Sequence, residues 1–425
     1  MFRLIMQDIA SLHQELIHIL SSINGDQNLF PQNVKSLYDF AMSNTIDIKR
    51  ENLIELAKKV TSFKSDLDNE GDLANYISTR LKKAGIEVHD EEVVAGRPNV
   101  IATVRSKDRD QLPLVINAHM DGAFHLTGWS RDPLEGWQEG DKLFGAAISD
   151  MKGGLASMVA AIEALNERKD LPRDVILQAV MHHDTVGLGT KYVLASEGPY
   201  EGYGICGEPS NMKVHYAHGG AVKFKITVRG HAAHVSRIED GVDALKSAVG
   251  LYQKISNMKP TGSPNPHLPN LPTVFVGILN GGFAAGCVAP QAELLGDIRT
   301  LPDMNRETVY RDLQQIISEN QVPGCEYEIK ITAAQKGLLG TSDSVIIQAL
   351  NSSFQKVRGH AVEISRAMPT QAFVTDGADM AAAGLETVVM GPGDWKYAPD
   401  EFISIKDMHD AARIYAQTAF ELPLR

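Results

Sequence analysis

Cysteine is scarce in this chain, and it has no long apolar run. The three cysteines, Cys206, Cys287 and Cys325, are far apart and odd in number, which argues against a disulfide framework and a structural zinc knuckle. No stretch approaches the roughly 20 apolar residues of a membrane span. Asp8 and Glu15 interrupt the apolar N-terminal stretch, unlike the core of a signal peptide. The sequence therefore predicts a soluble, cytoplasmic protein that does not act at a membrane.

Basic charge is also in short supply. The chain has 41 Lys and Arg against 53 Asp and Glu, which gives a net charge of -12. Phosphate backbones are bound through clustered Lys and Arg, so no nucleic-acid partner is expected. Hydrophobic residues make up 43% and charged residues 22% of the chain, which is the balance of a globular protein. A small-molecule substrate fits this composition.

The chain of 425 residues is long enough for two or three domains. Residues 1–50 predict a helical N-terminal extension of two amphipathic helices. Over residues 51–218 and again over 335–425, strands alternate with helices, which predicts a doubly wound, mainly parallel α/β sheet. Residues 219–334 follow a β-α-β-β-α-β order, which favours an inserted, four-stranded α+β domain with two helices.

Polar side chains follow the predicted strands of the larger domain. His119 follows one apolar run, Glu208 follows another, and Asp150 ends a loop. Ligand sites form at the carboxyl ends of strands in an open parallel sheet, so these imidazole and carboxylate groups are predicted to hold a divalent transition metal. Asp121 lies two residues beyond His119 and is expected to orient its imidazole. Each residue alone is more often structural, but their combination favours a metal site.

A series of short motifs occurs in order along residues 50–425. By these motifs the sequence resembles the co-catalytic zinc amidohydrolases, which include acetylornithine deacetylase, succinyl-diaminopimelate desuccinylase, aminoacylase and carboxypeptidase G. The motifs are HMD at 119–121, W-x-x-DP at 129–133, SDMKGG at 149–154, GLGT at 187–190, GEPS at 207–210, RGHAAH at 229–234, DIRTLP at 297–302, DGADM at 376–380 and PDEF at 399–402.

The resemblance implies roles for individual residues. His119 and Glu208 would hold one metal, and Asp150 would bridge to a second. His234 would reach from the inserted domain into the site of a second subunit and polarise the substrate, which implies a dimer or a higher homo-oligomer. Arg299 would bind a carboxylate of the substrate, a role that suits its planar guanidinium.

Four positions depart from the family pattern. Counted back from the GLGT motif, His183 and Asp184 stand where the family has two consecutive glutamates, a general base and a ligand of the second metal. Tyr397 stands where the family has a histidine ligand, and Cys287 where it usually has an asparagine. The ligands of the second metal are weakened or lost, so the sequence predicts one divalent ion per subunit. Oxygen-rich coordination suits manganese, zinc or cobalt.

Three functions remain open at this point. The chain could be a non-catalytic relative that acts as a binding protein, or an N-acyl amino acid deacylase or dipeptidase with a substituted base. The third and favoured reading is the hydrolytic removal of ammonia from an electron-poor aromatic amine, because a strongly electrophilic carbon needs only one metal-activated water and a base.

The favoured reading assigns the remaining polar residues. His183 is the expected base, since imidazole titrates near neutral pH, and Asp184 is expected to orient it. Tyr397 would touch the metal or the substrate. In its single metal the chain resembles 5-nitroanthranilate aminohydrolase, an offshoot of the same family. That resemblance implies conversion of 5-nitroanthranilate to 5-nitrosalicylate and ammonia, with the ring carboxylate bound by Arg299 or by the metal.

Overall fold

The computed structural model describes residues 46–425, apart from residues 109, 123–126, 184–186, 197, 199–200, 366–369 and 396–398. Residues 48–425 form one compact unit. The predicted helical extension over residues 1–50 lies almost wholly outside the described residues and stays a prediction. No described helix is long and apolar enough to cross a membrane.

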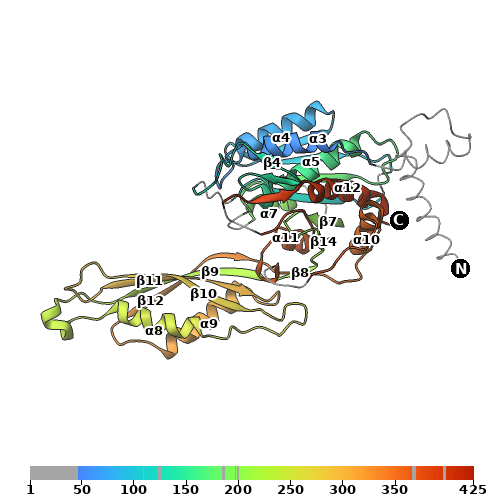
Figure 1. The fold of residues 1–425 in the computed structure, drawn as a ribbon. Coiled ribbons are helices and arrows are strands. Elements are labelled where there is room, and N and C mark those ends of the chain that lie inside the picture. Colours follow the sequence, from blue (N-terminus) through green and yellow to red (C-terminus); the bar gives the residue numbers. More distant parts are fainter. Residues whose placement is uncertain are drawn as a thin grey trace, which may run out of the picture. The chain divides into compact units, whose positions relative to one another are not determined.

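A six-stranded sheet forms the centre of the larger part of the chain (Figure 1). Its order is β1-β2-β6-β3-β7-β14. The strands β6, β3, β7 and β14 run parallel, β2 pairs antiparallel with β6, and β1 pairs antiparallel with β2. The strands are β1 (Glu87–Val94), β2 (Arg97–Val104), β3 (Leu114–His119), β6 (Val175–Val180), β7 (Gly202–Cys206) and β14 (Leu385–Val389). Every residue of β3 is buried, as expected of a central parallel strand. The predicted mainly parallel sheet is confirmed.

Helices pack against both faces of this sheet. In Figure 1, α3, α4 and α5 lie above β7 and β14. α4 contacts β1 and β2, α7 contacts β1 and β6, and α11 contacts β7 and β14. α5 contacts β2, β3 and β6 as well as α12, and its sequence is apolar on all sides, as a helix between two layers requires. The helices are α3 (Arg50–Thr61), α4 (Gly71–Lys83), α5 (Gly153–Asn166), α7 (Leu188–Ser196), α10 (Val345–Arg358), α11 (Gly377–Ala382) and α12 (Ile405–Glu421).

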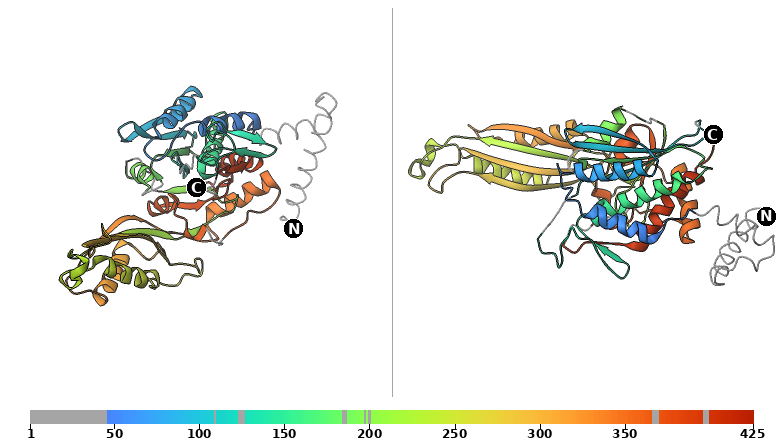
Figure 2. Two further views of the ribbon diagram at one scale, coloured as in Figure 1. Left: turned by 60° about the vertical axis from the view of Figure 1, so that its left-hand side comes forward. Right: turned by 90° about the horizontal axis from the view of Figure 1, so that it is seen from above.

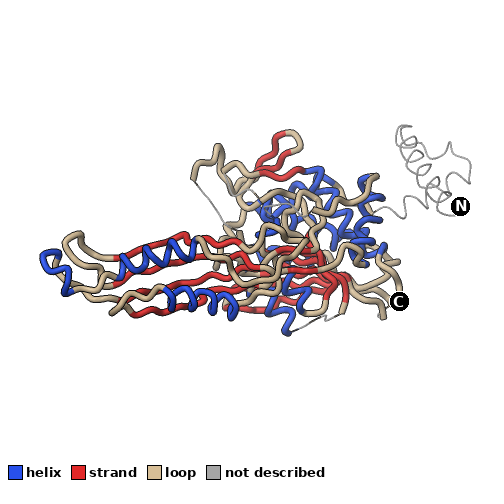
Figure 3. Tube along the Cα trace, turned by 90° about the horizontal axis from the view of Figure 1, so that it is seen from below, coloured by secondary structure: helices blue, strands red, loops and turns tan. Residues whose placement is uncertain are grey.

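A separate antiparallel sheet has the order β10-β11-β9-β12, and α8 and α9 pack side by side on it (Figures 2 and 3). Its elements are β9 (Gly220–Arg229), α8 (Ala244–Ser256), β10 (Thr273–Gly281), β11 (Gln291–Thr300), α9 (Arg306–Glu319) and β12 (Glu326–Gln335). This is the predicted β-α-β-β-α-β order. Asp243 and Asn305 cap α8 and α9 by accepting backbone N–H groups. The domain boundaries at 218/219 and 334/335 stay predictions.

Short elements complete the fold. The strands β8 (Ala217–His218) and β13 (Leu338–Leu339) pair where the chain enters and leaves the four-stranded sheet. A small three-stranded sheet combines β4 (Trp137–Glu139), β5 (Lys142–Phe144) and β15 (Phe402–Ser404). Three short helical segments are the π-helical η2 (Ile148–Lys152) and the 3-10 helices η3 (Val235–Asp240) and η4 (Thr370–Ala372). Of these segments, η2 places Asp150 beside His119 at the end of β3.

Candidate active site

Three polar side chains meet at the carboxyl ends of neighbouring parallel strands. His119 ends β3, His183 lies three residues beyond β6, and Glu208 lies two residues beyond β7. Their ligand-type atoms all lie within 4.8 Å of one another, and all three side chains are buried. Glu208 Oε1 is 3.6 Å from His119 Nε2 and 3.4 Å from His183 Nε2. Adjacent parallel strands bring these residues together although they are far apart in the sequence.

Asp150 approaches the same group from η2. Its Oδ1 lies 3.3 Å from His119 Nε2, and the residue is buried. The three residues predicted to hold a metal, His119, Asp150 and Glu208, are therefore brought together. His183, predicted as the base, lies within reach of the same point.

Both imidazoles are held in a defined orientation. His119 Nδ1 lies 2.7 Å from the backbone carbonyl of Asp121, and His183 Nδ1 lies 2.9 Å from Asp376 Oδ1. Because an oxygen acceptor stands beside each Nδ1, this nitrogen carries the hydrogen and Nε2 is turned towards Glu208. The rings stack with centroids 4.5 Å apart. An imidazole held by an oxygen on its far nitrogen is the usual arrangement of a metal-binding histidine.

Asp121 contacts His119 as expected, but through its backbone and not through its side chain. Its carbonyl, and not its carboxylate, accepts the hydrogen bond of His119, while Oδ1 lies 3.9 Å from Nδ1. The carboxylate instead accepts the backbone N–H of His183 at 2.9 Å. Asp121 therefore ties the two histidine-bearing strand ends together.

The charges around the site favour a bound cation. Burial lowers the pKa of His119, but the carboxylates of Glu208 and Asp150 outweigh it and hold the pKa well above its ordinary value. Burial likewise opposes protonation of His183, yet Asp376 and Glu208 raise its pKa to about 10. Neither oxygen of Glu208 has a hydrogen-bond partner among the described residues. A buried, unpaired carboxylate beside two imidazole nitrogens fits a divalent transition metal.

Asp376 and Thr190 belong to the site although sequence reasoning gave them no role. Thr190 Oγ1 donates to Asp376 Oδ2 at 2.8 Å, so both carboxylate oxygens of Asp376 are engaged. Burial opposes ionisation, but His183 and Thr190 lower the pKa of Asp376 below its ordinary value. Asp376 opens the DGADM motif and Thr190 closes GLGT. The motifs marked these positions without indicating that they contact each other.

A buried ion pair supports the turn that presents His183. Arg97 donates to both oxygens of Glu70, at 2.7 and 2.9 Å. The Glu70 carboxylate also accepts the backbone N–H of His182 at 3.1 Å, and Arg97 Nη2 lies 3.1 Å from His182 Nδ1. His182 has a φ of 54°, an unfavourable conformation for a residue with a side chain. These contacts fix the turn immediately before His183.

Comparison with known proteins shows the family of the chain. The family model of peptidase family M20/M25/M40 matches residues 115–421. The chain belongs to this family. It is 26% identical over 378 residues to acetylornithine deacetylase of Aliivibrio salmonicida, covering 85% of this chain and 95% of the relative. It is 25% identical over 391 residues to a probable succinyl-diaminopimelate desuccinylase of Staphylococcus aureus, covering 84% of this chain and 93% of the relative.

Solved structures show the same fold. A dinuclear metal binding peptidase of the M20 family from Bacillus subtilis superposes with a TM-score of 0.62 at 17% identity. The match covers 87% of this chain and 97% of that one. The predicted family and fold class are thus confirmed. The chain is an M20 hydrolase of the kind that acts on amide or peptide C–N bonds, and it has a candidate metal site.

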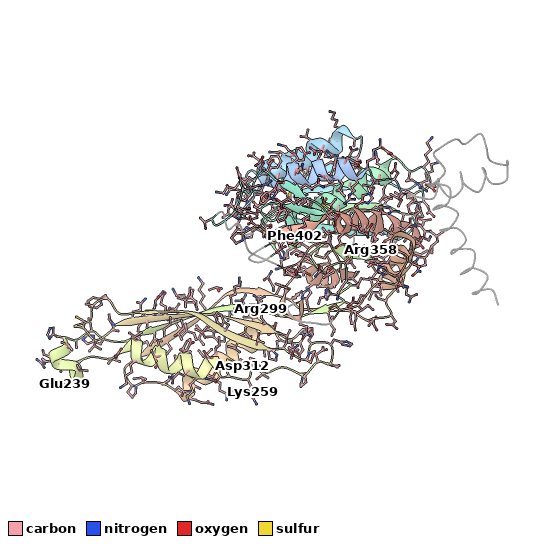
Figure 4. The ribbon with its side chains drawn as sticks, in the orientation of Figure 1. Glu239, Lys259, Arg299, Asp312, Arg358 and Phe402 are labelled. Atoms are coloured by element: carbon pink, nitrogen blue, oxygen red, sulfur yellow. The ribbon has the colours of Figure 1, made fainter. Side chains whose placement is uncertain are left out.

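The remaining predicted site residues of this M20 chain lie on the four-stranded sheet or outside the described residues. Figure 4 shows Arg299 at the end of this sheet nearest the rest of the chain and Glu239 of η3 at the opposite tip. Arg299 Nη1 donates to the carbonyl of Ala372 at 2.9 Å, and its Nε pairs with Asp297 at 3.0 Å. Its side chain is still 34% exposed.

His234 immediately precedes η3 and is exposed, with Nδ1 2.8 Å from Ser236 Oγ. Its backbone pairs with that of Cys287, so the two residues lie side by side. Among the described residues, neither His234 nor Cys287 contacts His119 or His183. Asp184 and Tyr397 lie outside the described residues, and their predicted roles stay predictions.

Two buried groups flank Asp150 in the M20 site. Burial lowers the pKa of Lys152 to about 7, and its Nζ donates to the carbonyl of Phe63 at 2.5 Å. Burial and the charge of Asp150 raise the pKa of Glu401 to about 8. Lys152 belongs to the SDMKGG motif and Glu401 to the PDEF motif. The sequence did not indicate that both side chains are buried near Asp150.

Proposed function

We propose that this M20 hydrolase removes ammonia from an electron-poor aromatic amine that carries a carboxylate, with 5-nitroanthranilate as the best candidate. The observation that carries the proposal is the His183–Asp376 pair. An imidazole held by a carboxylate faces Glu208, and it stands at the first of the two positions where the family pattern has paired glutamates. This substitution favours chemistry that needs one metal and a base.

Each residue near the centre receives a role in this proposal. His119, Asp150 and Glu208 hold one divalent ion, manganese, zinc or cobalt. When bound, that ion acts as a Lewis acid and lowers the pKa of a water molecule. His183 Nε2 accepts a proton from the water, while Asp376 keeps the hydrogen on Nδ1 and stabilises the imidazolium that forms. Asp121 holds the two strand ends in register.

The proposed reaction replaces the ring amino group by a hydroxyl. The oxygen of water bonds to the ring carbon that carries the amino group, and the nitro group para to it takes up the negative charge. His183 then returns the proton to the nitrogen, the C–N bond breaks, and ammonia leaves. 5-Nitroanthranilate and water thus give 5-nitrosalicylate and ammonia. A ring activated in this way needs less polarisation than a plain amide carbonyl.

Residues in and beside the four-stranded sheet are proposed to bind the substrate. Arg299 has a partly exposed guanidinium, a suitable partner for the ring carboxylate. His234 is exposed on the tip of the sheet and would complete the site of a second copy in a homo-oligomer. Tyr397 would contact the metal or the substrate.

A second candidate function is supported by the relatives. The similarity to acetylornithine deacetylase favours hydrolysis of an N-acyl amino acid, with His183 in place of the usual base. A binding protein without catalysis is the contrasting alternative. The three functions predict different products, because a deacylase releases a carboxylic acid, an aminohydrolase releases ammonia, and a binding protein releases neither.

One set of related substrates tests all three functions. The full chain loaded with manganese, zinc or cobalt is incubated with 5-nitroanthranilate, with its N-acetyl derivative, and with anthranilate, which lacks the nitro group. Ammonia from 5-nitroanthranilate alone supports the proposal, and anthranilate should be inert because nothing takes up the charge. Acetate from the N-acetyl derivative without any ammonia supports the deacylase. If neither product appears with any of the metals or with N-acyl amino acids, the enzyme function is contradicted.

A further inference from the structure

Two aromatic side chains outside the cluster of His119, His183 and Glu208 stack on each other. Phe373 and Trp395 have ring centroids 3.4 Å apart and an angle of 13° between their planes. Both residues are only partly buried. At this separation no third ring fits between them, so a ligand would contact an outer face or an edge of the stack. The pair combines residues from the loop before α11 and the loop after β14.

Both loops lead directly to the candidate metal centre. Phe373 precedes Asp376 by three residues, which places their Cα atoms at most about 11 Å apart, and Asp376 contacts His183. On the other side, Trp395 follows Asp394, whose backbone N–H donates to Ser149 Oγ at 2.8 Å. Ser149 precedes Asp150. The stack therefore joins the loop behind the proposed base to the loop beside a proposed metal ligand.

The indole nitrogen of Trp395 has no acceptor in the part of the chain that the structure describes. Its Nε1 is buried, and it has no hydrogen-bond partner among the described residues. A buried donor that stays unpaired destabilises the protein, so such groups in native structures usually have a partner that binds later or is not seen. A ligand oxygen beside the stack would satisfy this N–H group.

Arg299 lies next to the same stack. Its Nη1 donates to the carbonyl of Ala372, the residue before Phe373. A cation for a carboxylate, an aromatic surface and an N–H donor without a partner among the described residues are thus linked through Ala372 and Phe373. These three features match the three parts of a nitro-substituted aromatic acid.

We infer that the Phe373–Trp395 stack binds the ring of a planar aromatic acid and that Trp395 Nε1–H donates to its nitro oxygen. The inference rests on the proposed function and specifies the substrate class of that site. Arg299 takes the carboxylate, the stack contacts the ring, and the ring carbon that bears the amino group faces the metal centre. A stack that served only to hold the two loops together would show no preference for aromatic acids.

Binding of three inert acids to the manganese-loaded full chain tests this inference. The acids are 3-nitrobenzoate, which is 5-nitroanthranilate without its amino group, benzoate, and cyclohexanecarboxylate. All three carry the carboxylate, so differences between their calorimetric Kd values report on the ring and the nitro group. We expect benzoate to bind at least about threefold more tightly than cyclohexanecarboxylate, and 3-nitrobenzoate to bind more tightly still.

Two variants separate the stack from the donor. Trp395→Phe keeps an aromatic ring but removes the N–H group, so it should weaken 3-nitrobenzoate about fivefold and leave benzoate unchanged. Phe373→Leu should weaken both aromatic acids towards the affinity of cyclohexanecarboxylate. Trp137→Phe is the matched control, because Trp137 also stacks on a ring, that of Phe144 at 5.0 Å, but in the three-stranded sheet. This variant should bind all three acids as the wild type does.

Equal Kd values for benzoate and cyclohexanecarboxylate in the wild type would overturn the inference, even if Phe373→Leu failed to fold. Unchanged binding of 3-nitrobenzoate to Trp395→Phe would overturn the assigned role of Nε1. Because none of these acids is hydrolysed, the result does not depend on turnover. If the expected affinities were found but 5-nitroanthranilate released no ammonia, the aromatic-acid site would stand and the proposed reaction would fail.

Discussion

The carboxylate of Asp376 lies 2.9 Å from Nδ1 of His183, and both side chains are buried. The two residues are 193 positions apart in the sequence. The contact fixes the imidazole and directs Nε2 towards Glu208, while His119 stacks on the face of the ring. A carboxylate behind an imidazole can support either metal binding or proton transfer, and variants can distinguish these roles.

Replacing Asp376 by Asn should lower kcat or the affinity for the metal by about 10- to 100-fold, because the neutral amide no longer stabilises an imidazolium or fixes the hydrogen on Nδ1. Steady-state kinetics and a metal titration measure the two effects. Asp379→Asn is the control, since Asp379 belongs to the same motif but pairs with Lys191. If both variants lost activity equally, damage to α11 would explain the result better than loss of the contact with His183.

His183→Ala should abolish turnover while the metal content stays close to one ion per subunit, because this nitrogen is proposed to accept a proton. His119→Ala should lose both activity and metal. Elemental analysis of the purified variants distinguishes the two results. A single Nε2 lone pair cannot bind a metal and accept a proton at once. Loss of the metal from His183→Ala would therefore assign His183 as a ligand and contradict its role as the base.

Glu70→Gln should destabilise the protein by roughly 3 kcal/mol, because it leaves the largely buried guanidinium of Arg97 with only the exposed Asp68 as its counter-charge. It should also lower kcat, since Glu70 accepts the backbone N–H of His182 beside the proposed base. Glu87→Gln is the matched control. Arg105 binds Glu87 through the same two-pronged contact, but these side chains are 42% and 59% exposed.

The exposed pair should contribute no more than about 1 kcal/mol. Urea unfolding of the wild type and both variants measures the difference. Similar losses in the two variants would show that burial of the Arg97–Glu70 pair is not what makes it important.

Local sequence patterns were enough to predict the fold class and that His119, Asp150 and Glu208 would lie close together. The buried run before His119 and the short apolar strand before Glu208 identify parallel strands, and polar residues at their ends lie together for topological reasons. The β-α-β-β-α-β order of the second sheet was likewise visible from alternation and helix periodicity. These features depend on residues close together in the sequence, so one amino-acid sequence is enough to predict them.

Contacts between distant loops could not be predicted in the same way. Asp376 faces His183 because α11 packs beside β7 and β14, and nothing in residues 370–380 indicates this neighbour. The Phe373–Trp395 stack depends on the same long-range packing. Asp121 was expected to act through its side chain, but its backbone carbonyl makes the contact with His119. Backbone groups are present at every position, so the sequence gives no sign of which one is used.

Two buried histidines should make the protein sensitive to acid. Burial lowers the pKa of His215 and of His218 to about 4. His218 Nδ1 lies 2.7 Å from the Gly219 carbonyl, and its Nε2 lies 2.9 Å from Thr375 Oγ1. Between the unfolded pKa of about 6.5 and the folded value, the unfolded chain binds more protons than the folded one. The stability that these residues contribute is present above that window and is lost as the pH falls through it.

His218→Gln should therefore flatten the dependence of unfolding free energy on pH between about 4.5 and 6.5. One proton bound only by the unfolded chain changes stability by about 1.4 kcal/mol per pH unit, so the variant's slope should be shallower by up to that amount. His360→Gln, at an exposed position, should give a curve parallel to that of the wild type. Urea unfolding of metal-free protein across this range measures all three slopes. Parallel curves for His218→Gln and the wild type would mean that His218 takes up its proton without unfolding, which its two hydrogen bonds and complete burial argue against.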